Sequence, residues 1–195
     1  MKKILRLSSL ALIALIMACG SPANDKNDDK KALSIKVMDQ DQLKEEIANR
    51  EAALNADTLQ MNKQTAARLM EAYATYSKRF PHYEESPDYL FKAGEIAMGL
   101  GHSIEAIKYF ERVYAEYDRY DKHPFSLFMK AYILENQIGE YDQAKAIYEQ
   151  FLEEFPNHEM AADAKFSIKN LGKTPEELIR EFEIKDSLDK VNQAS

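Results

Sequence analysis

Two segments of the chain repeat one pattern: Gly101–Val113 reads GHSIEAIKYFERV and Gly139–Phe151 reads GEYDQAKAIYEQF. A glycine, an alanine, an aromatic residue, a glutamate and an apolar residue occupy the same places in both, at a separation of 38 residues. A partial third copy lies upstream, 75 residues before the second one, and its matching residues are Leu69, Tyr73, Tyr76, Phe80 and Pro81. An internal period of about 20 to 50 residues is typical of stacked repeats.

The apolar residues in and around these segments recur every three or four positions, which is the spacing of one face of an α-helix. Prolines and glycines fall almost only between such stretches, where helices begin and end. Thr174 to Glu177 reads TPEE, a helix start with threonine as the N-cap and glutamate three residues later. No run with β-type alternation is longer than Leu33 to Met38. The sequence therefore predicts an all-α fold.

The repeated residues resemble the tetratricopeptide repeat (TPR), a helix-turn-helix unit of about 34 residues. The copy that begins near Pro87 matches at Leu90, Ala93, Gly94, Gly101, Ala106, Phe110 and Val113. The copy that begins near Phe125 matches at Phe128, Ala131, Gly139, Tyr141, Ala144, Tyr148, Phe151 and Pro156. We expect the small residues to let helices approach closely, and Phe110 and Tyr148 to fill the space between neighbouring pairs. The resemblance covers roughly Thr58–Leu171 and implies an α-solenoid of TPR-type repeats.

Two further helices are predicted to flank the repeats, over Asp41–Asn55 and Pro175–Lys190. Because the terminal repeats of a solenoid would otherwise expose an apolar face, they need a cap with a polar outer side. We expect the second helix to be such a cap, with Leu178, Ile179 and Phe182 turned inward. The first helix carries a narrow stripe formed by Leu43, Ile47, Arg50 and Leu54. This stripe favours an equivalent cap, with a coiled-coil seam to another copy as the alternative.

In TPR proteins the first helix of each pair lines a groove that takes up an extended peptide or a helix of a partner. Carried onto the matching positions, the resemblance implies a protein-binding groove lined by Asp88, Phe91, Glu95, Met98, Ser126, Met129, Ile133 and Asn136. Methionine and phenylalanine suit adaptable apolar contacts. The alternative is that Phe91, Met129 and Ile133 pack against the flanking helices and leave no open groove. A second candidate patch surrounds the turn with extra residues near 121–124 and contains Tyr114, Tyr117, Tyr120 and Tyr132.

The start of the chain has the layout of an export signal. Three basic residues within Met1–Arg6 precede an uncharged, nearly all-apolar run, Leu7–Ala18, which is too short to remain as a membrane span. Ile16–Cys19 resembles the bacterial lipoprotein signal, which implies cleavage before Cys19 and lipidation of that cysteine. Gly20, in place of aspartate, is similar to outer-membrane lipoproteins. The alternative is that Cys19, the one cysteine of the chain, is an ordinary apolar residue of the signal.

These patterns divide the chain into four expected segments. Residues 1–18 form a signal peptide, and residues 19–38 carry the lipidated cysteine and a flexible tether, because Gly20–Lys31 is small, polar and charged. Residues 39–190 form the TPR domain, and residues 191–195 are a C-terminal tail. An anchor of two or more acyl chains on Cys19 would hold the domain stably at a membrane.

The composition excludes several other functions. Acidic residues outnumber basic ones, 33 to 26, and the formal net charge of −7 argues against nucleic-acid binding, which requires clustered lysine and arginine. The four histidines are expected to be solvated turn residues with no pair at metal-ligand spacing, and they are His82, His102, His123 and His158. Phosphate-binding loops and nucleophile elbows are absent from the sequence. We therefore expect no enzyme activity, no cofactor and no metal.

The expected function is that of a lipid-anchored scaffold on the outer membrane, with its domain in the periplasm. Its partners would be envelope or outer-membrane proteins, and the process it serves would be outer-membrane assembly or envelope maintenance. The chain is similar to the TPR lipoprotein of the β-barrel assembly machine and to the TPR domain of the Tol-Pal coordinator protein. Two alternatives stay open: a structural, self-assembling lipoprotein, and an enzyme whose residues come together only in three dimensions.

Overall fold

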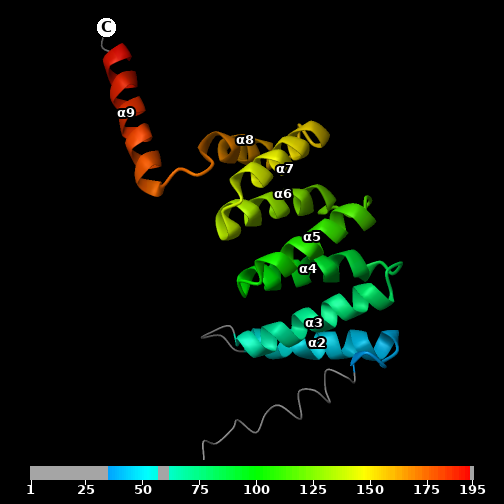
Figure 1. Cartoon of the computed structure of the whole chain (residues 1–195). Helices are drawn as coiled ribbons and strands as arrows, with labels where there is room; N and C mark the ends of the chain where they lie inside the picture. Colours follow the sequence, from blue (N-terminus) through cyan, green and yellow to red (C-terminus); the bar gives the residue numbers. More distant parts are fainter. Residues whose placement is uncertain (1–34, 57–61, 194–195) are drawn as a thin grey trace, which may run out of the picture.

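The computed structural model of the chain describes residues 35–56 and 62–193. Most of this part of the chain is helical and none of it is a strand (Figure 1). The α-helices are α2 (Gln40–Ala56), α3 (Lys63–Arg79), α4 (Glu85–Gly99), α5 (Ser103–Glu116), α6 (His123–Ile133), α7 (Tyr141–Glu154), α8 (Ala161–Asn170) and α9 (Pro175–Gln193). A π-helical segment, η1 (Leu134–Ile138), continues α6. The prediction of an all-α fold is confirmed.

Helices α2 to α8 stack on one another in the order of the chain (Figure 1). Helices α3 to α7 each pack mainly against the helix before and the helix after, whereas α2 packs on α3 and α8 packs on α7. The segments that repeat at 38 residues begin at the turns before α5 and α7, so they mark the second helices of two successive pairs. This arrangement is a helical repeat solenoid, as the sequence predicted.

The small residues of the repeats lie where helices come closest. A Cβ atom added to Gly94 of α4 would lie 2.9 Å from the ring of Phe110 of α5. The two backbones therefore approach more closely than any residue with a side chain would allow at this position. Ala106 and Ala144 are fully buried, and the rings of Phe110 and Tyr148 are buried beside them. The predicted role of Gly94 is confirmed, while burial places the two alanines and the two rings in the core without testing their finer roles.

Helix ends follow the glycine and capping signals of the sequence. Gly139 adopts a left-handed φ of 80°, and the N–H of Glu140 donates to the carbonyl of Leu134 at 2.9 Å across the end of η1. At the start of α9 the N–H of Glu177 donates to Oγ1 of Thr174 at 3.2 Å. The N–H of Thr174 donates in return to the Glu177 carboxylate at 2.8 Å, which completes the predicted capping box.

The first helix of the described chain is a cap. Leu43 and Ile47 of α2 are buried in the same core as the repeats, because α2 packs along α3. Arg50 is also buried; its Nε donates to Glu46 at 2.8 Å, and its guanidinium donates to the carbonyl of Arg68 on α3. The predicted stripe therefore faces its own solenoid, and the coiled-coil alternative is wrong.

The packed region begins before the predicted boundary at residue 39. Ile35 is fully buried, and the guanidinium of Arg79 donates to its carbonyl at 3.0 Å. The expected tether therefore ends by Ile35, because this contact holds the chain against the end of α3. The predicted signal peptide, Cys19 and the rest of the tether lie outside the described residues.

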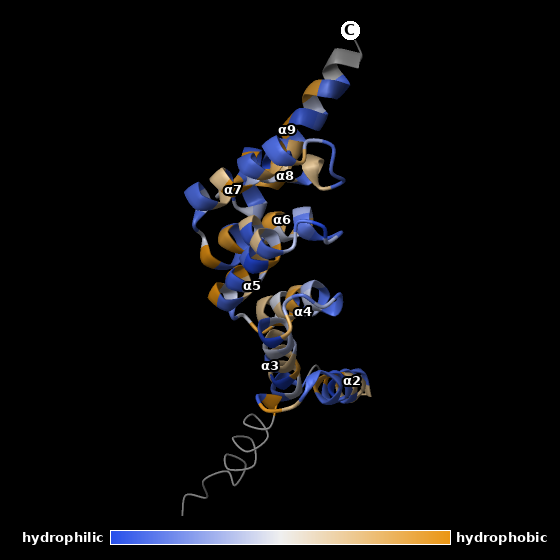
Figure 2. Ribbon diagram, turned by 90° about the vertical axis from the view of Figure 1, so that its right-hand side faces the viewer, coloured by the Kyte–Doolittle hydropathy of each residue, from blue (hydrophilic) through white to orange (hydrophobic). Residues whose placement is uncertain are grey.

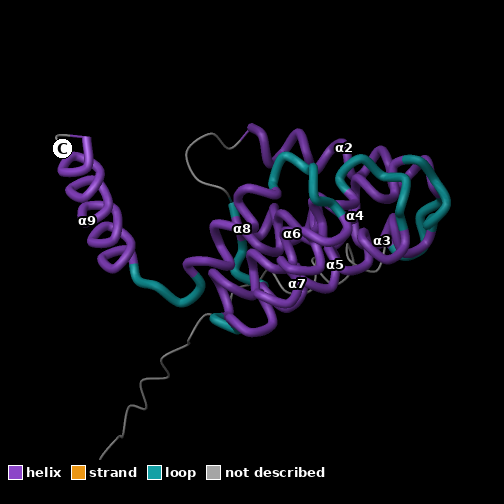
Figure 3. The backbone as a smooth tube through the Cα atoms, turned by 90° about the horizontal axis from the view of Figure 1, so that it is seen from above, coloured by secondary structure: helices purple, strands orange, loops and turns teal. Residues whose placement is uncertain are grey.

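The last helix differs from the predicted cap. After the turn at 171–174, α9 leaves the stack and points away from it (Figures 1 and 3). Ile179 is 58% exposed and Phe182 is 57% exposed, while Leu178 is half-buried. The prediction that these residues face inward is therefore wrong for Ile179 and Phe182. The chain turns at Gly172, which has a left-handed φ of 75° and lies near the ring of Tyr141.

Candidate protein-binding surface

Four of the eight residues predicted to line the groove belong to the core. Phe91 is 1% exposed, and Ser126, Met129 and Ile133 are buried as well. The cause at Phe91 is the long turn between α5 and α6. Its Tyr120 packs edge-on against the Phe91 ring, with 6.2 Å between ring centroids, and the Nζ of Lys122 lies 4.7 Å from the centre of that ring. These four residues cannot line an open groove, which corrects the prediction.

The other four residues predicted to line the groove remain accessible in part. Glu95 and Asn136 are exposed, and Asp88 and Met98 are half-buried. The Asn136 amide donates to the carbonyl of Tyr132 at 3.0 Å, so it is engaged with its own helix. The structure thus keeps Asp88 and Glu95 of α4 as surface groups that a partner can reach.

Asp88 is the centre of a network of charges around α4. Its carboxylate lies 2.9 Å from Nζ of Lys92 and 3.9 Å from Nζ of Lys122, and it accepts a hydrogen bond of 3.0 Å from Tyr120. Lys92 also reaches Glu51 of α2 at 3.6 Å. We call Glu51, Asp88, Lys92, Glu95 and Lys122 the α4 charged surface.

The surroundings alter the proton affinity of two groups on this surface. Partial burial acts to lower the pKa of Lys92, but the hydrogen bond to Asp88 and the charges of Asp88 and Glu51 raise it above the ordinary value. Partial burial raises the pKa of the Glu95 carboxyl; Lys122 opposes this shift and Asp88 adds to it. In the described part of the chain Glu95 has no ion-pair partner within 4.0 Å, so its carboxylate is free to accept hydrogen bonds from a ligand.

Two stacked tyrosine rings lie next to Lys92 of the α4 charged surface. Tyr73 of α3 and Tyr89 of α4 stack with 5.1 Å between centroids, and Nζ of Lys92 lies 5.7 and 5.8 Å from the two centres. The Tyr73 hydroxyl donates to Glu51. Burial and this hydrogen bond raise the pKa of Tyr73 far above its ordinary value. The lysine is therefore held in place by rings and carboxylates together.

Lys92, Glu51 and Lys122 were not predicted from the sequence as members of this surface. Lys92 had a detectable signal, since a lysine four residues after Asp88 on a helix is placed to form an ion pair. Glu51 and Lys122 had none, because they come from a different helix and from a turn.

The predicted tyrosine patch holds the turn in place. The Tyr114 ring stacks on His123 at 4.9 Å, and its hydroxyl donates to Glu154 of α7 at 2.6 Å. Tyr120 is bonded to Asp88, and Tyr132 is 40% exposed. Of the four tyrosines in this prediction, Tyr132 is therefore the one with a largely accessible ring.

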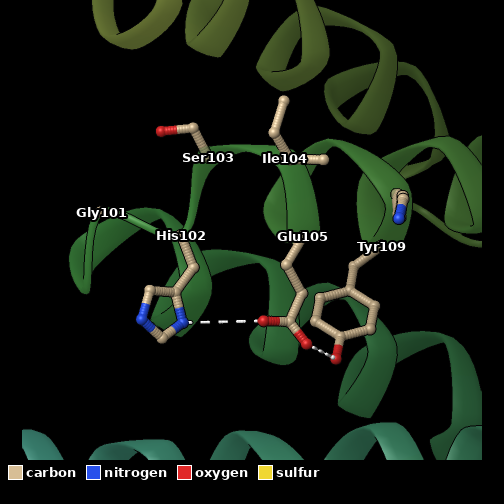
Figure 4. A pocket seen from close by; sticks show the side chains of 7 residues that line it. Gly101, His102, Ser103, Ile104, Glu105 and Tyr109 are labelled. Carbon is tan, nitrogen blue, oxygen red and sulfur yellow. Dashed lines mark hydrogen bonds and ion pairs between the residues drawn. The ribbon is translucent and has the colours of Figure 1, made fainter.

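The four histidines are spread over different inter-helix turns. His102 lies in an open pocket of about 630 Å³ at the start of α5, where its Nδ1 is 3.6 Å from Glu105 and the hydroxyl of Tyr109 donates to the same carboxylate at 2.8 Å (Figure 4). His82 and His102 are exposed, as expected. His123 and His158 are not simply solvated, because both rings pack edge-on against aromatic rings of the core.

Two kinds of feature are absent from the part of the chain that the structure describes. In residues 35–56 and 62–193, histidine, cysteine, aspartate and glutamate side chains do not form a group of three that could hold a metal ion. In the same ranges, every helix is too short or too polar to cross a lipid bilayer.

The repeat region matches known sequence families at two places. Residues 87–116 match one profile of the tetratricopeptide repeat, and residues 125–158 match another. The first match covers most of α4 and all of α5, and the second covers most of α6 and all of η1 and α7. No curated protein matches the chain. The helix pairs found in the structure and the matched segments therefore coincide.

Proposed function

We propose that this chain, which contains tetratricopeptide repeats, is a protein-binding scaffold held on a bacterial outer membrane by acyl chains on Cys19. The main observation in support of a scaffold function is the agreement between the two repeat matches and the helix pairs α4–α5 and α6–α7. Repeats of this kind generally mediate contacts between proteins. The proposal assigns no chemical reaction to the protein.

The α4 charged surface is the proposed contact region. It offers carboxylates at Asp88 and Glu95 beside the ammonium groups of Lys92 and Lys122. Such a mixed row suits the polar groups and charged side chains of an extended peptide or an exposed helix, and a basic residue of the partner would face Glu95. Contacts between charged groups at the edge of an interface act mainly on the rate of association and on specificity.

The membrane anchor is proposed from the sequence. The basic, then apolar, then cysteine-containing start of the chain resembles a lipoprotein signal, and acylation would consume the thiol of the one cysteine. A substituted Cys19→Ala chain is expected to incorporate no radiolabelled palmitate and to leave the membrane fraction. If the Cys19→Ala chain still incorporates the label, Cys19 is not the site of acylation.

The contact region is tested by capture of partners from crosslinked membranes. The variant is Glu95→Lys, which reverses the charge of an exposed group without touching the core. The matched control is Glu149→Lys, an equal change on an exposed residue of α7. We expect the first variant to lose at least one partner that the native chain and the control both retain. If the folded Glu95→Lys chain keeps every partner, the α4 charged surface is not the contact region.

A further inference from the structure

The last helix of the stack has an uncovered face. In the earlier pairs each first helix is packed between two neighbours, as α4 is between α3 and α5. Helix α8 packs against α7, and the side that a following helix would cover carries Phe166, which is 50% exposed. The same helix carries two exposed lysines, Lys165 and Lys169, and one exposed aspartate, Asp163. The end of the solenoid therefore combines an exposed apolar ring with a helix whose two lysines and one aspartate give it a net charge of +1.

Helix α9 has the properties of the missing neighbour, although it does not occupy that place. Ile179 and Phe182 lie on adjacent turns of the helix and are both more than half exposed. In Figure 2 helix α9 carries hydrophobic positions, in orange, among hydrophilic ones and extends away from the rest of the chain. The helix PEELIREFEIKDSLDKVNQ contains six acidic and three basic residues, so its net charge of −3 is opposite in sign to the net charge of +1 on α8.

The turn between the two helices keeps α9 away from the α8 of its own chain. A Cβ on Gly172 would lie 3.5 Å from the ring of Tyr141, so the turn rests on that ring. The Nζ of Lys173 lies 2.7 Å from the carboxylate of Glu181 and 3.2 Å from Oδ1 of Asn170. These contacts tie the first turns of α9 to the connecting segment in the outward direction.

We propose that α9 of one copy covers the exposed face of α8 in a second copy, and that the second copy does the same in return. Ile179 and Phe182 would pack on Phe166 of the other chain, and the acidic residues of α9 would lie near Lys165 and Lys169. Such an exchange is a two-fold, self-complementary contact. It gives both exposed apolar surfaces one occupant, a second copy of this chain, and it leaves the α4 charged surface open to other proteins.

The contact is tested by disulfide crosslinking between two copies of the full-length chain that carry different tags. One copy has Phe166→Cys and the other has Phe182→Cys, and both are expressed together and oxidised in intact cells. Both positions are half exposed or more, so neither change removes a core contact. We expect a disulfide-linked product that contains both tags and has twice the 22.4 kDa mass of the chain. Docked cysteines meet at an effective concentration on the order of millimolar, so the yield should exceed a collisional control at least about ten-fold.

The control pair replaces Phe166→Cys by Ile104→Cys, an exposed position on α5. It measures linkage by random collision or through Cys19, which all chains contain. A third chain carries Phe166→Cys and Phe182→Cys together. If this chain forms its disulfide internally and runs as a monomer, α9 folds onto its own α8 and the proposal is wrong. A mixed-tag product no more abundant than in the control pair overturns it as well.

Discussion

Replacing Gly94 with alanine tests the close packing of α4 on α5. The new methyl group would lie 2.9 Å from Cε1 and Cζ of Phe110, whereas carbon atoms in contact are ordinarily separated by about 3.5 to 4.0 Å. The ring cannot simply move away, because Phe110 is fully buried and its ring lies 5.2 Å from that of Phe91. One of the two helices must therefore shift.

Two opposing effects determine how much Gly94→Ala changes the free energy of unfolding. Overpacking of a well-filled core costs about 1 to 3 kcal/mol. Alanine in place of glycine inside a helix contributes up to about 1 kcal/mol in the other direction. We therefore expect Gly94→Ala to lower the free energy of unfolding by about 1 kcal/mol, which corresponds to a decrease in Tm of about 2 to 4 °C for a chain of this size.

The measurement is urea unfolding followed by circular dichroism. The matched control is Gly99→Ala, which adds the same methyl group at an exposed position of the same helix and should raise stability slightly or leave it unchanged. In a Phe110→Leu background, where the ring is absent, Gly94→Ala should become stabilising by up to about 1 kcal/mol. If Gly94→Ala stabilises the native chain as much as Gly99→Ala does, the argument from close packing fails.

Three further predictions concern hydrogen bonds and pH. Tyr148→Phe removes a partly buried hydrogen bond of 2.8 Å to Glu135, so we expect the free energy of unfolding to fall by about 0.5 to 1.5 kcal/mol, as measured by urea unfolding; an unchanged midpoint would contradict it. Burial, the first cause in both cases, raises the pKa of Tyr73 and Tyr148, so the stability that these groups contribute is complete below pH 10 and is lost as the pH rises further. Absorbance at about 295 nm should show their ionisation together with loss of helix, and ionisation of every tyrosine in a folded chain would count against this. The hydrogen bond from Lys44 lowers the pKa of Glu85. The stability that the ionised Glu85 contributes is therefore complete above about pH 4.5 and is lost as the pH falls through the lowered pKa. Lys44→Gln should make the Tm measured by thermal unfolding depend less on pH in this acid range.

Much of the fold could be predicted because its signals are local. Helical spacing, proline and glycine at the turns, and the TPEE start each depend on a few neighbouring residues. The internal repeat also predicted the order in which the helices stack. A repeat unit that cannot bury its apolar face alone must pack on the next unit in the chain. Gly94 and Phe110 were assigned correctly for this reason, as they recur at set places in a known unit.

The candidate site was predicted only in part. Asp88 and Glu95 are accessible, but Phe91 and Met129 were expected to line a groove and lie in the core. The residues that cover Phe91 come from the α5–α6 turn, whose extra length was visible but whose path was not. The residue pattern of one helix does not show which side chains of a distant turn will cover that helix.

By itself, the sequence determined an all-α stack of repeats, where its helices begin and end, and which small residues lie at the helix crossings. These are properties of spacing and of local backbone preference. Only the tertiary structure decided that Lys122 lies over the expected groove, that Glu51 joins Lys92, and that α9 leaves the stack. Those outcomes depend on the direction in which two turns lead the chain. A turn sets that direction through contacts with distant residues, such as Gly172 with Tyr141, which no local pattern contains.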